Sequence, residues 1–488
     1  MRNHKTLFLT PLLLVSLLLN AVIAHQPAIA PDPIEQAAAR LAGSIVVNGR
    51  AMDYLRGLTD QFGGRLTGTP AYQRSAEWAA EQFRAAGLKN VKLEPFTVSN
   101  GWDRGSARGR MISPMDRPIH IQSLGWAPST PPGGVKAEVI MFSELAPEKI
   151  KAQAGKLKGR AVMLDLATVF ADGFSAFAKL IAALPILRDV GASAIVVSDN
   201  ERNNVLNAFG FTWGGQLSPL PLAQVGMEDG KLIERLLAKG PVTLEFAFEN
   251  RTSGPIQVNN VIAELQGREK PDEWIIIGGH LDSWDYGTGA QDNGTGCAMV
   301  LEAARAIAAM GAPRRSIRFA LWGGEEEGLL GSAAYVNAHK AELGKCVAAL
   351  NTDNGAGHPK GWKVQGRADL NQAMKSISVL LAGLSGDGLS QETTFDTDHG
   401  HFMLGGIPAL DLWVDMSHYG EVHHKSSDTI DKVDVHNLTA GSAIIAITAY
   451  AIAERTERIA PHIDRGAVAE VLKKAKLDEF LKAIGLWN

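Results

Sequence analysis

Short apolar runs alternate with longer amphipathic stretches over residues 251–488. The apolar runs have the length of strands and occur in "NNVIAEL", "EWIIIGGH", "SIRFALWGG" and "CVAALNTDN". Between them, stretches such as "GTGCAMVLEAARAIAAMG" carry apolar residues three to four positions apart, which is typical of helices. This alternation predicts an α/β domain with a doubly wound, mostly parallel sheet.

The N-terminal part of the chain continues this pattern before a second region interrupts it. Residues 52–87 contain the helical stretch "SAEWAAEQFRAAGL", and "NVKLEPFTV" follows with the alternation of a strand. The Pro- and Gly-rich passage "GWAPSTPPGGVKAEVIMF" then marks a boundary. Beyond it, strand-like "GRAVMLDL" and "ASAIVVSDN" and helical "KLIERLLAKG" predict a smaller α/β insertion. We therefore expect residues 25–120 and 251–488 to form one domain and residues 121–250 to be inserted into it.

The two ends of the chain have distinct patterns. Arg2 and Lys5 precede an apolar stretch from Leu7 to Leu19, and small residues follow up to Ala24, which is the layout of a secretory signal peptide over residues 1–24. An uncleaved anchor is the alternative, but the apolar stretch is short for a spanning helix. We expect a secreted or periplasmic mature protein with no later membrane-spanning segment. The C-terminal "AVAEVLKKAKLDEFLKAIGL" predicts an amphipathic helix that packs on the protein.

Composition and charge exclude some functions. The 488 residues are 45% hydrophobic and 20% charged, which is ordinary for a large globular protein. A formal net charge of −4 gives no sign of nucleic-acid binding. The two cysteines, Cys297 and Cys346, cannot form a disulfide framework, and either one bridge or two buried thiols remain open. Specific sites must therefore reveal the function.

Acids and histidines follow several predicted strands directly. His280 follows "WIIIGG", Glu325 and Glu326 follow "IRFALWGG", and Asp353 follows "VAALNT". His423 and His424 come after the apolar run "IPALDLWV". A single ionisable residue at a strand end is usually a cap or a surface group, but functional groups of open α/β sheets collect beyond the carboxyl ends of the strands. The repeated placement indicates a site at one edge of the sheet.

Imidazole nitrogens and carboxylate oxygens are ligands that zinc prefers in proteins. Two histidines and three acids, one of them shared, would hold two ions roughly 3.5–4 Å apart around a bridging water. We expect Asp292 to be the shared ligand, because the glycines of "GTGAQDNGTG" permit the close backbone approach that such a position needs.

The run Glu325–Glu326–Glu327 has two interpretations. Acidic runs usually form a solvated surface, but this one lies between apolar "FALWGG" and "GLLGS". Neighbouring residues at a strand end point in different directions, so one Glu can bind metal while the other faces the water as a general base.

These segments together resemble the co-catalytic di-zinc aminopeptidase family. The resemblance rests on "GGHLDSWDYGTGAQDNGTG", "WGGEEEGLLGS", "NTDNGAG", "TDHGHFMLGGIPALDL" and "HHKSSDT", in this order. The "GGHLDSWD" form, with eleven residues between His280 and Asp292, is most similar to the carboxypeptidase Q (plasma glutamate carboxypeptidase) branch. The resemblance extends to "FGGRLTGTPAYQRSAEWAAEQF" in the peptidase domain, and it implies that the insertion is a protease-associated domain.

The resemblance implies a role for each matching residue. It implies that Glu325 is the general base and that Asp282 orients the imidazole of a ligand. His424 is preferred to His423 because the family's ligand histidine stands four residues before the Asp of its "DT" pair, here Asp428. We expect Asp285, Asp398 and His399 to be structural or to support the ligands, and Tyr419 either to stabilise an oxyanion or to pack. One zinc is expected on His280 and Asp353, the other on Glu326 and His424, and both on Asp292.

We therefore expect a secreted or periplasmic zinc exopeptidase that hydrolyses dipeptides or short peptides with a metal-bridged water and a Glu base. The residues do not decide between dipeptidase or carboxypeptidase polarity and aminopeptidase polarity. A non-catalytic binding ectodomain and a single-zinc glutaminyl cyclase of the same fold are the alternatives. A short peptide is the only partner that the sequence implies, and the oligomeric state stays open, a homodimer included.

Overall fold

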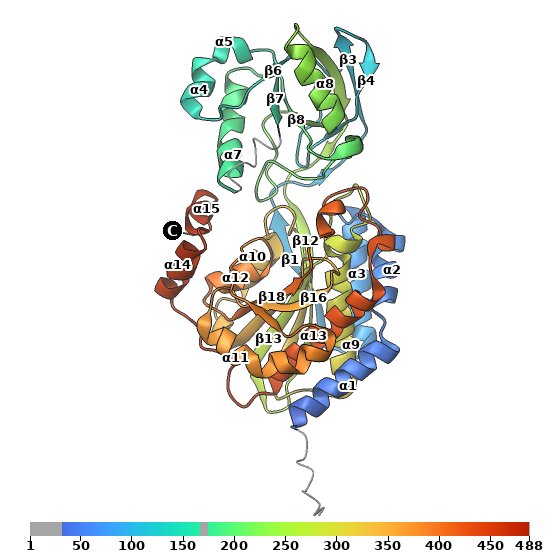
Figure 1. Ribbon diagram of the computed structural model, residues 1–488, viewed down its shortest axis with the longest axis vertical. Coiled ribbons are helices and arrows are strands. Elements are labelled where there is room, and N and C mark those ends of the chain that lie inside the picture. Colours follow the sequence, from blue (N-terminus) through green and yellow to red (C-terminus); the bar gives the residue numbers. More distant parts are fainter. Residues whose placement is uncertain (1–31, 166–173, 488) are drawn as a thin grey trace, which may run out of the picture.

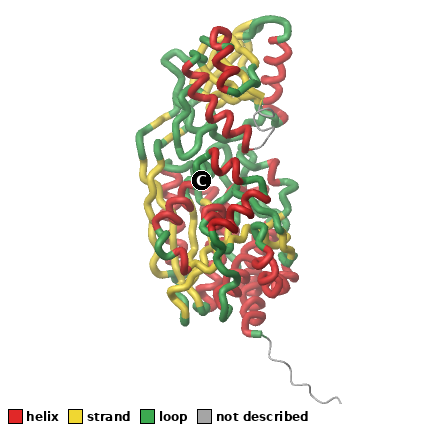
Figure 2. The backbone as a smooth tube through the Cα atoms, turned by 90° about the vertical axis from the view of Figure 1, so that its left-hand side faces the viewer, coloured by secondary structure: helices red, strands yellow, loops and turns green. Residues whose placement is uncertain are grey.

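The computed structural model describes residues 32–165 and 174–487. It contains two eight-stranded sheets that lie one above the other along the long axis of the molecule (Figures 1 and 2). The expected signal peptide, residues 1–24, lies outside the described residues.

The first sheet carries the predicted α/β pattern. Its four central strands, β14, β13, β15 and β18, run parallel. On one side β1 and β12 pair antiparallel to their neighbours, and on the other β16 pairs antiparallel to β18 and parallel to β17. The α/β class is confirmed, but the sheet as a whole is mixed. In spatial order its strands are β1 (Lys89–Val98), β12 (Ile256–Leu265), β14 (Arg315–Trp322), β13 (Lys270–His280), β15 (Cys346–Asn351), β18 (Ala409–Val414), β16 (Pro359–Lys363) and β17 (Gly388–Ser390).

Helices cover both faces of this sheet, because its central strands are apolar on both sides. In β13, Ile275 and Ile277 pack into the core beneath one set of helices, while Trp274 and Ile276 pack on the opposite face. The first set comprises α1 (Pro33–Asn48), α2 (Ala51–Phe62), α3 (Pro70–Ala85), α9 (Thr295–Met310), α11 (Ala368–Ser378) and α13 (Val435–Glu454). The opposite face is covered by α10 (Leu330–Ala338) and α12 (His399–Leu404).

The second sheet is built from residues 107–248. β6, β7, β8 and β9 run parallel at its centre, α7 packs on one face and α8 on the other. β3 and β4, which precede residue 121, are part of this sheet. Its strands are, in spatial order, β4 (Arg117–Pro118), β3 (Ala107–Ser113), β10 (Thr243–Phe248), β6 (Val135–Met141), β7 (Ala161–Asp165), β8 (Ala194–Ser198), β9 (Leu222–Val225) and β5 (Ile121–Ser123). The helices of this region are α4 (Pro147–Ala152), α5 (Ala154–Leu157), α7 (Phe174–Asp189) and α8 (Met227–Leu237). Its assignment as a protease-associated domain stays a prediction.

A two-stranded sheet of β2 (Trp102–Asp103) and β11 (Arg251–Thr252) joins the two segments that link the large sheets. The C-terminal tail forms two helices, α14 (Arg465–Lys474) and α15 (Asp478–Ala483), where one continuous helix was expected. The break falls at Lys476, whose φ of 59° is left-handed and ends the helical path. α15 thereby turns toward the second sheet and contacts α7 (Figure 1).

One helix of the described residues is long and apolar enough by composition to cross a membrane. This helix is α13, and most of it is buried in the protein. It packs against α1 and α9 in the main core, with the Asp434 carboxylate capping its first turn. Its apolar composition is therefore explained by its position as a central core helix.

Candidate metal centre

Three of the singled-out side chains come from neighbouring strands at one edge of the first sheet. β14, β13 and β15 are parallel neighbours, so their carboxyl ends lie side by side. His280 is the last residue of β13, Glu325 lies just beyond β14, and Asp353 lies just beyond β15. The loop after β18 brings His424 to the same place. The structure thus gathers the residues that the strand pattern predicted.

His280 presents one ring nitrogen to two carboxylates. Its Nδ1 lies 2.9 Å from the backbone carbonyl oxygen of Asp282, which favours a proton on Nδ1. Its Nε2 lies 2.9 Å from Oδ1 of Asp353 and 3.2 Å from Oδ1 of Asp292. All three side chains are largely buried. Their donor atoms lie within 4.8 Å of one another, which is close enough to hold one metal ion.

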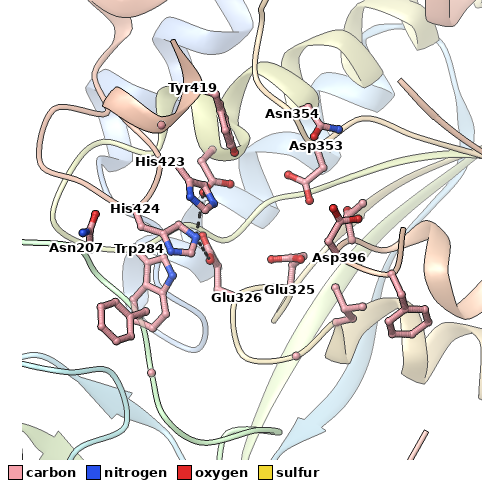
Figure 3. A pocket seen from close by; sticks show the side chains of 18 of the residues that line it. Asn207, Trp284, Glu325, Glu326, Asp353, Asn354, Asp396, Tyr419, His423 and His424 are labelled. Atoms are coloured by element: carbon pink, nitrogen blue, oxygen red, sulfur yellow. Dashed lines mark ion pairs between the residues drawn. The ribbon is translucent and has the colours of Figure 1, made fainter. Parts of the chain in front are cut away.

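Asp292 turns its other oxygen toward the histidine pair. Its Oδ2 lies 3.3 Å from Nε2 of His424 and 3.6 Å from Nε2 of His423. The Nε2 of His424 also lies 3.1 Å from Oε2 of Glu326 (Figure 3). Asp292, His423 and His424 form a second group of donors that could hold an ion. Asp292 therefore belongs to both groups, with one oxygen directed to each.

His424 and His423 differ in how they sit at this second group. Their rings stack with centroids 3.8 Å apart, so both reach the same place. His424 is the less exposed, at 24% against 46% for His423, and an ion pair with Glu326 is found for His424. His424 also has a φ of 61°, a left-handed conformation that a non-glycine residue rarely adopts outside constrained sites. These contacts agree with the preference for His424, and its role as a ligand stays a prediction.

The acidic run Glu325–Glu327 is not a solvated surface. The side chains of Glu325 and Glu326 are only 12% and 3% exposed, and Glu327 is buried. Glu325 and Glu326 point to different neighbours, since Oε2 of Glu325 lies 4.0 Å from Nε2 of His280 whereas Glu326 contacts His424. The carboxylates of these two adjacent residues therefore face different partners.

The crowding of acids favours a cation at this site. Burial and the Asp353 carboxylate raise the pKa of Glu325 well above its usual range, and burial and the Asp292 carboxylate do the same for Glu326. Burial raises the pKa of Asp353 to about 7. Each carboxylate opposes ionisation of its neighbours, and Oε1 of Glu326 is buried without a hydrogen-bond partner. Divalent cations would reduce the repulsion among the carboxylates and would give the unpaired oxygen of Glu326 a partner. The donor set therefore fits metal ions.

The comparisons with known proteins agree with this geometry. The sequence model of peptidase family M28 matches residues 260–449, which include all five expected metal ligands. The chain therefore resembles peptidase family M28 over the segment that carries the candidate centre. Carboxypeptidase Q from Rattus norvegicus is 26% identical over 422 residues, which cover 84% of this chain and 86% of the relative.

Solved structures of M28 peptidases extend the likeness to the fold of nearly the whole chain. The M28 peptidase precursor from Shewanella amazonensis SB2B is 28% identical with a TM-score of 0.78, and the match covers 88% of this chain and 99% of that one. BSAP, a zinc aminopeptidase from Bacillus subtilis, is 20% identical with a TM-score of 0.65, covering 85% of this chain and 98% of that one. The latter shows the shared fold alone.

Two residues whose roles the sequence did not reveal, Arg65 and Asp428, fix the loop that carries Asp292. The Asp428 carboxylate accepts hydrogen bonds from the backbone N–H of Gln291 and of Asp292. The buried guanidinium of Arg65 donates to the carbonyl oxygens of Leu281, Thr288 and Gly289. The available signals were Arg65 in "FGGRLTGT" and Asp428 in "HHKSSDT", but nothing in the sequence shows which backbone groups they reach.

Asp282 contacts His280 differently from the expectation. The backbone carbonyl of Asp282 faces Nδ1, while its Oδ1 is 3.7 Å away. Its Oδ2 instead accepts hydrogen bonds from Thr67 Oγ1 and from the backbone N–H of Glu326. Asp282 therefore links His280 to the acidic run, and an orienting role for its carboxylate stays a prediction.

The other residues considered from the sequence lie around the centre. Asp285 pairs with Arg104 at 2.7 Å, and the Nε2 of His399 faces the carbonyl oxygen of Thr394. Asp398 is fully buried, and burial raises its pKa to about 8. Cys297 and Cys346 are both buried free thiols, so the open question of a bridge between them is settled.

A cavity of about 780 Å³ opens beside the carboxylates (Figure 3). Its lining combines Glu325, Asp353 and His424 with aromatic side chains from two other parts of the chain. Phe209 and Trp213 come from the segment between β8 and β9, and Phe480 comes from α15. The rings of Trp213 and Phe480 meet edge to face with centroids 6.5 Å apart. The second sheet and the C-terminal tail thus both contribute to the walls of the cavity.

Hydrogen bonds attach the segment between β8 and β9 to the metal-ligand loops. The backbone N–H of Ala208 donates to the carbonyl of His424 at 2.7 Å, and that of Gly214 donates to the carbonyl of Glu327 at 2.8 Å. Lys425, next to His424, pairs with Glu201 at 2.8 Å. The position of this segment is therefore coupled to the candidate centre.

Proposed function

We propose that this protein is a zinc-dependent exopeptidase of the M28 type that hydrolyses dipeptides or short peptides outside the cytoplasm. The observation that carries the proposal is the position of Asp292, whose two oxygens face His280 on one side and His424 on the other. The name of a relative, carboxypeptidase Q, supports the reaction class, and the gathered histidines and carboxylates support zinc as the metal. Export rests on the N-terminal sequence pattern.

The donor geometry supports two ions. In this proposal His280 and Asp353 hold one, Glu326 and His424 hold the other, and Asp292 is shared. Bound zinc supplies Lewis acidity, which polarises a peptide carbonyl and makes water a better nucleophile near neutral pH. The remaining chemistry falls to side chains that line the cavity.

Glu325 is suited to move the proton. It lines the cavity and is more exposed than Glu326, so water and substrate can reach its carboxylate. As general base it takes the proton of the attacking water, and as general acid it returns that proton to the leaving amine. In this proposal Tyr419, which also lines the cavity, donates a hydrogen bond from its hydroxyl to the oxyanion.

The proposal is tested by measuring metal content and peptide hydrolysis of the purified mature protein. We expect about two zinc ions per chain and hydrolysis of unblocked short peptides that a chelator abolishes and zinc restores. One zinc ion with cyclisation of N-terminal glutamine would indicate the cyclase alternative. A protein without zinc and without hydrolysis would indicate the binding ectodomain.

A further inference from the structure

The two ions of the proposed centre differ in what holds their ligands. His280 is the last residue of β13 and Asp353 lies just beyond β15, so the first sheet fixes the ligands assigned to one ion. Glu326 and His424, which are assigned to the other ion, lie in the loops after β14 and β18. A ligand on a loop keeps its position only if contacts from outside the loop support it.

The segment between β8 and β9 supplies such contacts to both loop ligands. The backbone N–H of Ala208 donates to the carbonyl oxygen of His424 at 2.7 Å. The N–H of Gly214 donates at 2.8 Å to the carbonyl oxygen of Glu327, the residue after Glu326. The first contact falls on a residue whose left-handed φ of 61° needs support from its surroundings. One segment next to the second sheet therefore holds the backbone at both ligands of the same ion.

A buried ion pair strengthens the same junction. Lys425, the residue after His424, is only 5% exposed, and its Nζ lies 2.8 Å from Oε1 of Glu201 in the segment between β8 and β9. The ammonium group also donates to the carbonyl oxygen of Gly420 in its own loop. Because Lys425 is buried, loss of the Glu201 carboxylate would leave this charge without its carboxylate partner.

Asp199 fixes the shape of the segment between β8 and β9. It lies just beyond β8, it is buried, and its N–H donates to the carbonyl oxygen of Val225 in β9 at 2.9 Å. Its carboxylate accepts five hydrogen bonds, from the backbone N–H groups of Asn200, Glu201 and Asn207 and from the side-chain amides of Asn207 and Gln224. The carboxylate thereby sets the positions of Glu201, which pairs with Lys425, and of Asn207, which directly precedes Ala208.

We propose that Asp199 is a positioning residue for the ion assigned to Glu326 and His424, and that the segment between β8 and β9 is a structural part of that half of the metal centre. This inference rests on the proposed function. Asp199 does not line the cavity, so it acts through the loop of His424 and not on the substrate. Loss of its carboxylate should weaken one zinc site and leave the other unchanged.

The test measures the zinc affinities of Asp199→Asn by competition with a chelator. Asparagine keeps the size of the side chain but replaces an acceptor oxygen by an N–H₂ donor, which faces donors of the segment. We expect the affinity for one zinc ion to fall by roughly tenfold or more and the affinity for the other to change by less than about twofold. Asp189→Asn is the matched control, because Asp189 is an exposed aspartate of the same region that pairs with Arg188, and both affinities should stay at the wild-type values.

Ligand variants identify the affected ion. Asp353→Asn impairs the ion assigned to His280, and Glu326→Gln impairs the other. Adding Asp199→Asn to Asp353→Asn should therefore weaken the zinc ion that remains by roughly tenfold. Adding Asp199→Asn to Glu326→Gln should change the affinity for the remaining ion by less than about twofold.

Two further measurements keep the test decisive. Glu201→Gln removes only the ion pair with Lys425 and replaces Asp199→Asn if the latter does not fold, and it should weaken the same ion by roughly threefold. Amide hydrogen exchange of the metal-free protein does not depend on zinc. Residues 418–428 should exchange faster in Asp199→Asn than in Asp189→Asn.

Wild-type zinc affinities and wild-type exchange of residues 418–428 in Asp199→Asn would overturn the inference, and so would wild-type affinities in Glu201→Gln. Equal losses of both ions would also overturn it, because they would indicate a general effect on the fold. A wild-type protein that binds fewer than two zinc ions would instead contradict the proposed two-ion centre. In that event the exchange comparison still decides whether Asp199 positions the loop of His424.

Discussion

The carboxylate of Asp428 binds the backbone of Asp292 and not the side chain of Asp292. One carboxylate oxygen of Asp428 accepts the N–H of Gln291 at 2.7 Å, and the other accepts the N–H of Asp292 at 3.1 Å. The side chain of Asp292 therefore stays free to face both groups of metal donors while its backbone is fixed.

Asp428→Asn replaces one of these acceptor oxygens by an N–H₂ donor and leaves a buried backbone N–H unpaired. We expect a loss of about 1–3 kcal/mol in the free energy of unfolding and weaker zinc binding. Denaturant titration of the metal-free protein and a competition assay with a zinc chelator measure the two effects. Asp431→Asn in the same loop is exposed and serves as control. Unchanged zinc affinity in Asp428→Asn would show that the fixed loop is not needed for the metal.

Glu325→Gln and Glu326→Gln separate proton transfer from metal binding. Glutamine keeps the size of the side chain but cannot accept the proton, so Glu325→Gln should keep its zinc while kcat falls by roughly 100-fold or more. Glu326→Gln should instead lower the zinc content, because Glu326 contacts His424. Zinc analysis and hydrolysis rates at saturating metal are the measurements. The opposite pattern would reverse the two assignments, and normal behaviour of both variants would refute the mechanism.

Asp292→Asn should impair both ions together. The change removes negative charge from the one side chain that faces both donor groups, so we expect fewer than about one zinc ion per chain under conditions that load the wild type. Asp285→Asn is a control at an acid of the same loop that pairs with Arg104 instead. Two zinc ions and normal turnover in Asp292→Asn would exclude a shared ligand.

Trp213→Ala and Phe480→Ala remove the two halves of an aromatic contact in the cavity wall. We expect kcat/KM for substrates with large apolar side chains to fall by roughly 10-fold, because each ring contributes apolar contact area, and smaller substrates to be less affected. A substrate series from alanyl to phenylalanyl anilides measures the effect. Phe62→Ala, which removes an aromatic pair that does not line the cavity, is the control. Equal losses for all substrates would mean that the pair supports the fold alone.

His339 makes the stability of the protein depend on pH at a place away from the cavity. Hydrogen bonds to the carboxylates of Glu94 and Glu342 raise its pKa above the usual value. Because the pKa of His339 is higher in the folded protein, protonation of His339 stabilises the fold. This stabilisation is fully present below the unfolded pKa of about 6.5, and it is lost as the pH rises through the pKa of the folded protein.

The difference in unfolding free energy between wild type and His339→Gln should therefore be about 0.5–1 kcal/mol near pH 6 and shrink toward pH 9. Denaturant titrations across this pH range measure it, with His436→Gln at an exposed position as control. A difference that does not change with pH would mean that His339 acts by packing and not by charge.

Local sequence patterns predict most strands of the first sheet and the ionisable residues at their ends. The strand that ends at His280 and the acids beyond the next strands could be placed at one edge because parallel strands share their carboxyl ends. The sequence could not show that Arg65 and Asp428 bind the loop around Asp292, because these contacts join residues 136 or more positions apart and involve backbone groups. The strands β1 and β12 were predicted, but their antiparallel direction was not, since strand direction depends on connections rather than on composition.

The chain leaves the first sheet at Val98 and returns to it at Ile256, and these two residues pair directly across the antiparallel strands β1 and β12. The two ends of everything in between therefore lie only one strand spacing apart, about 5 Å. A tight turn could close β1 onto β12 without changing any other strand partner in that sheet. The module between these two residues can therefore be accommodated without rearranging the first sheet. Since Trp213 of that module lines the cavity and the backbone N–H of Ala208 binds the carbonyl of His424, replacing the module would change the cavity wall while the first sheet kept its strand order.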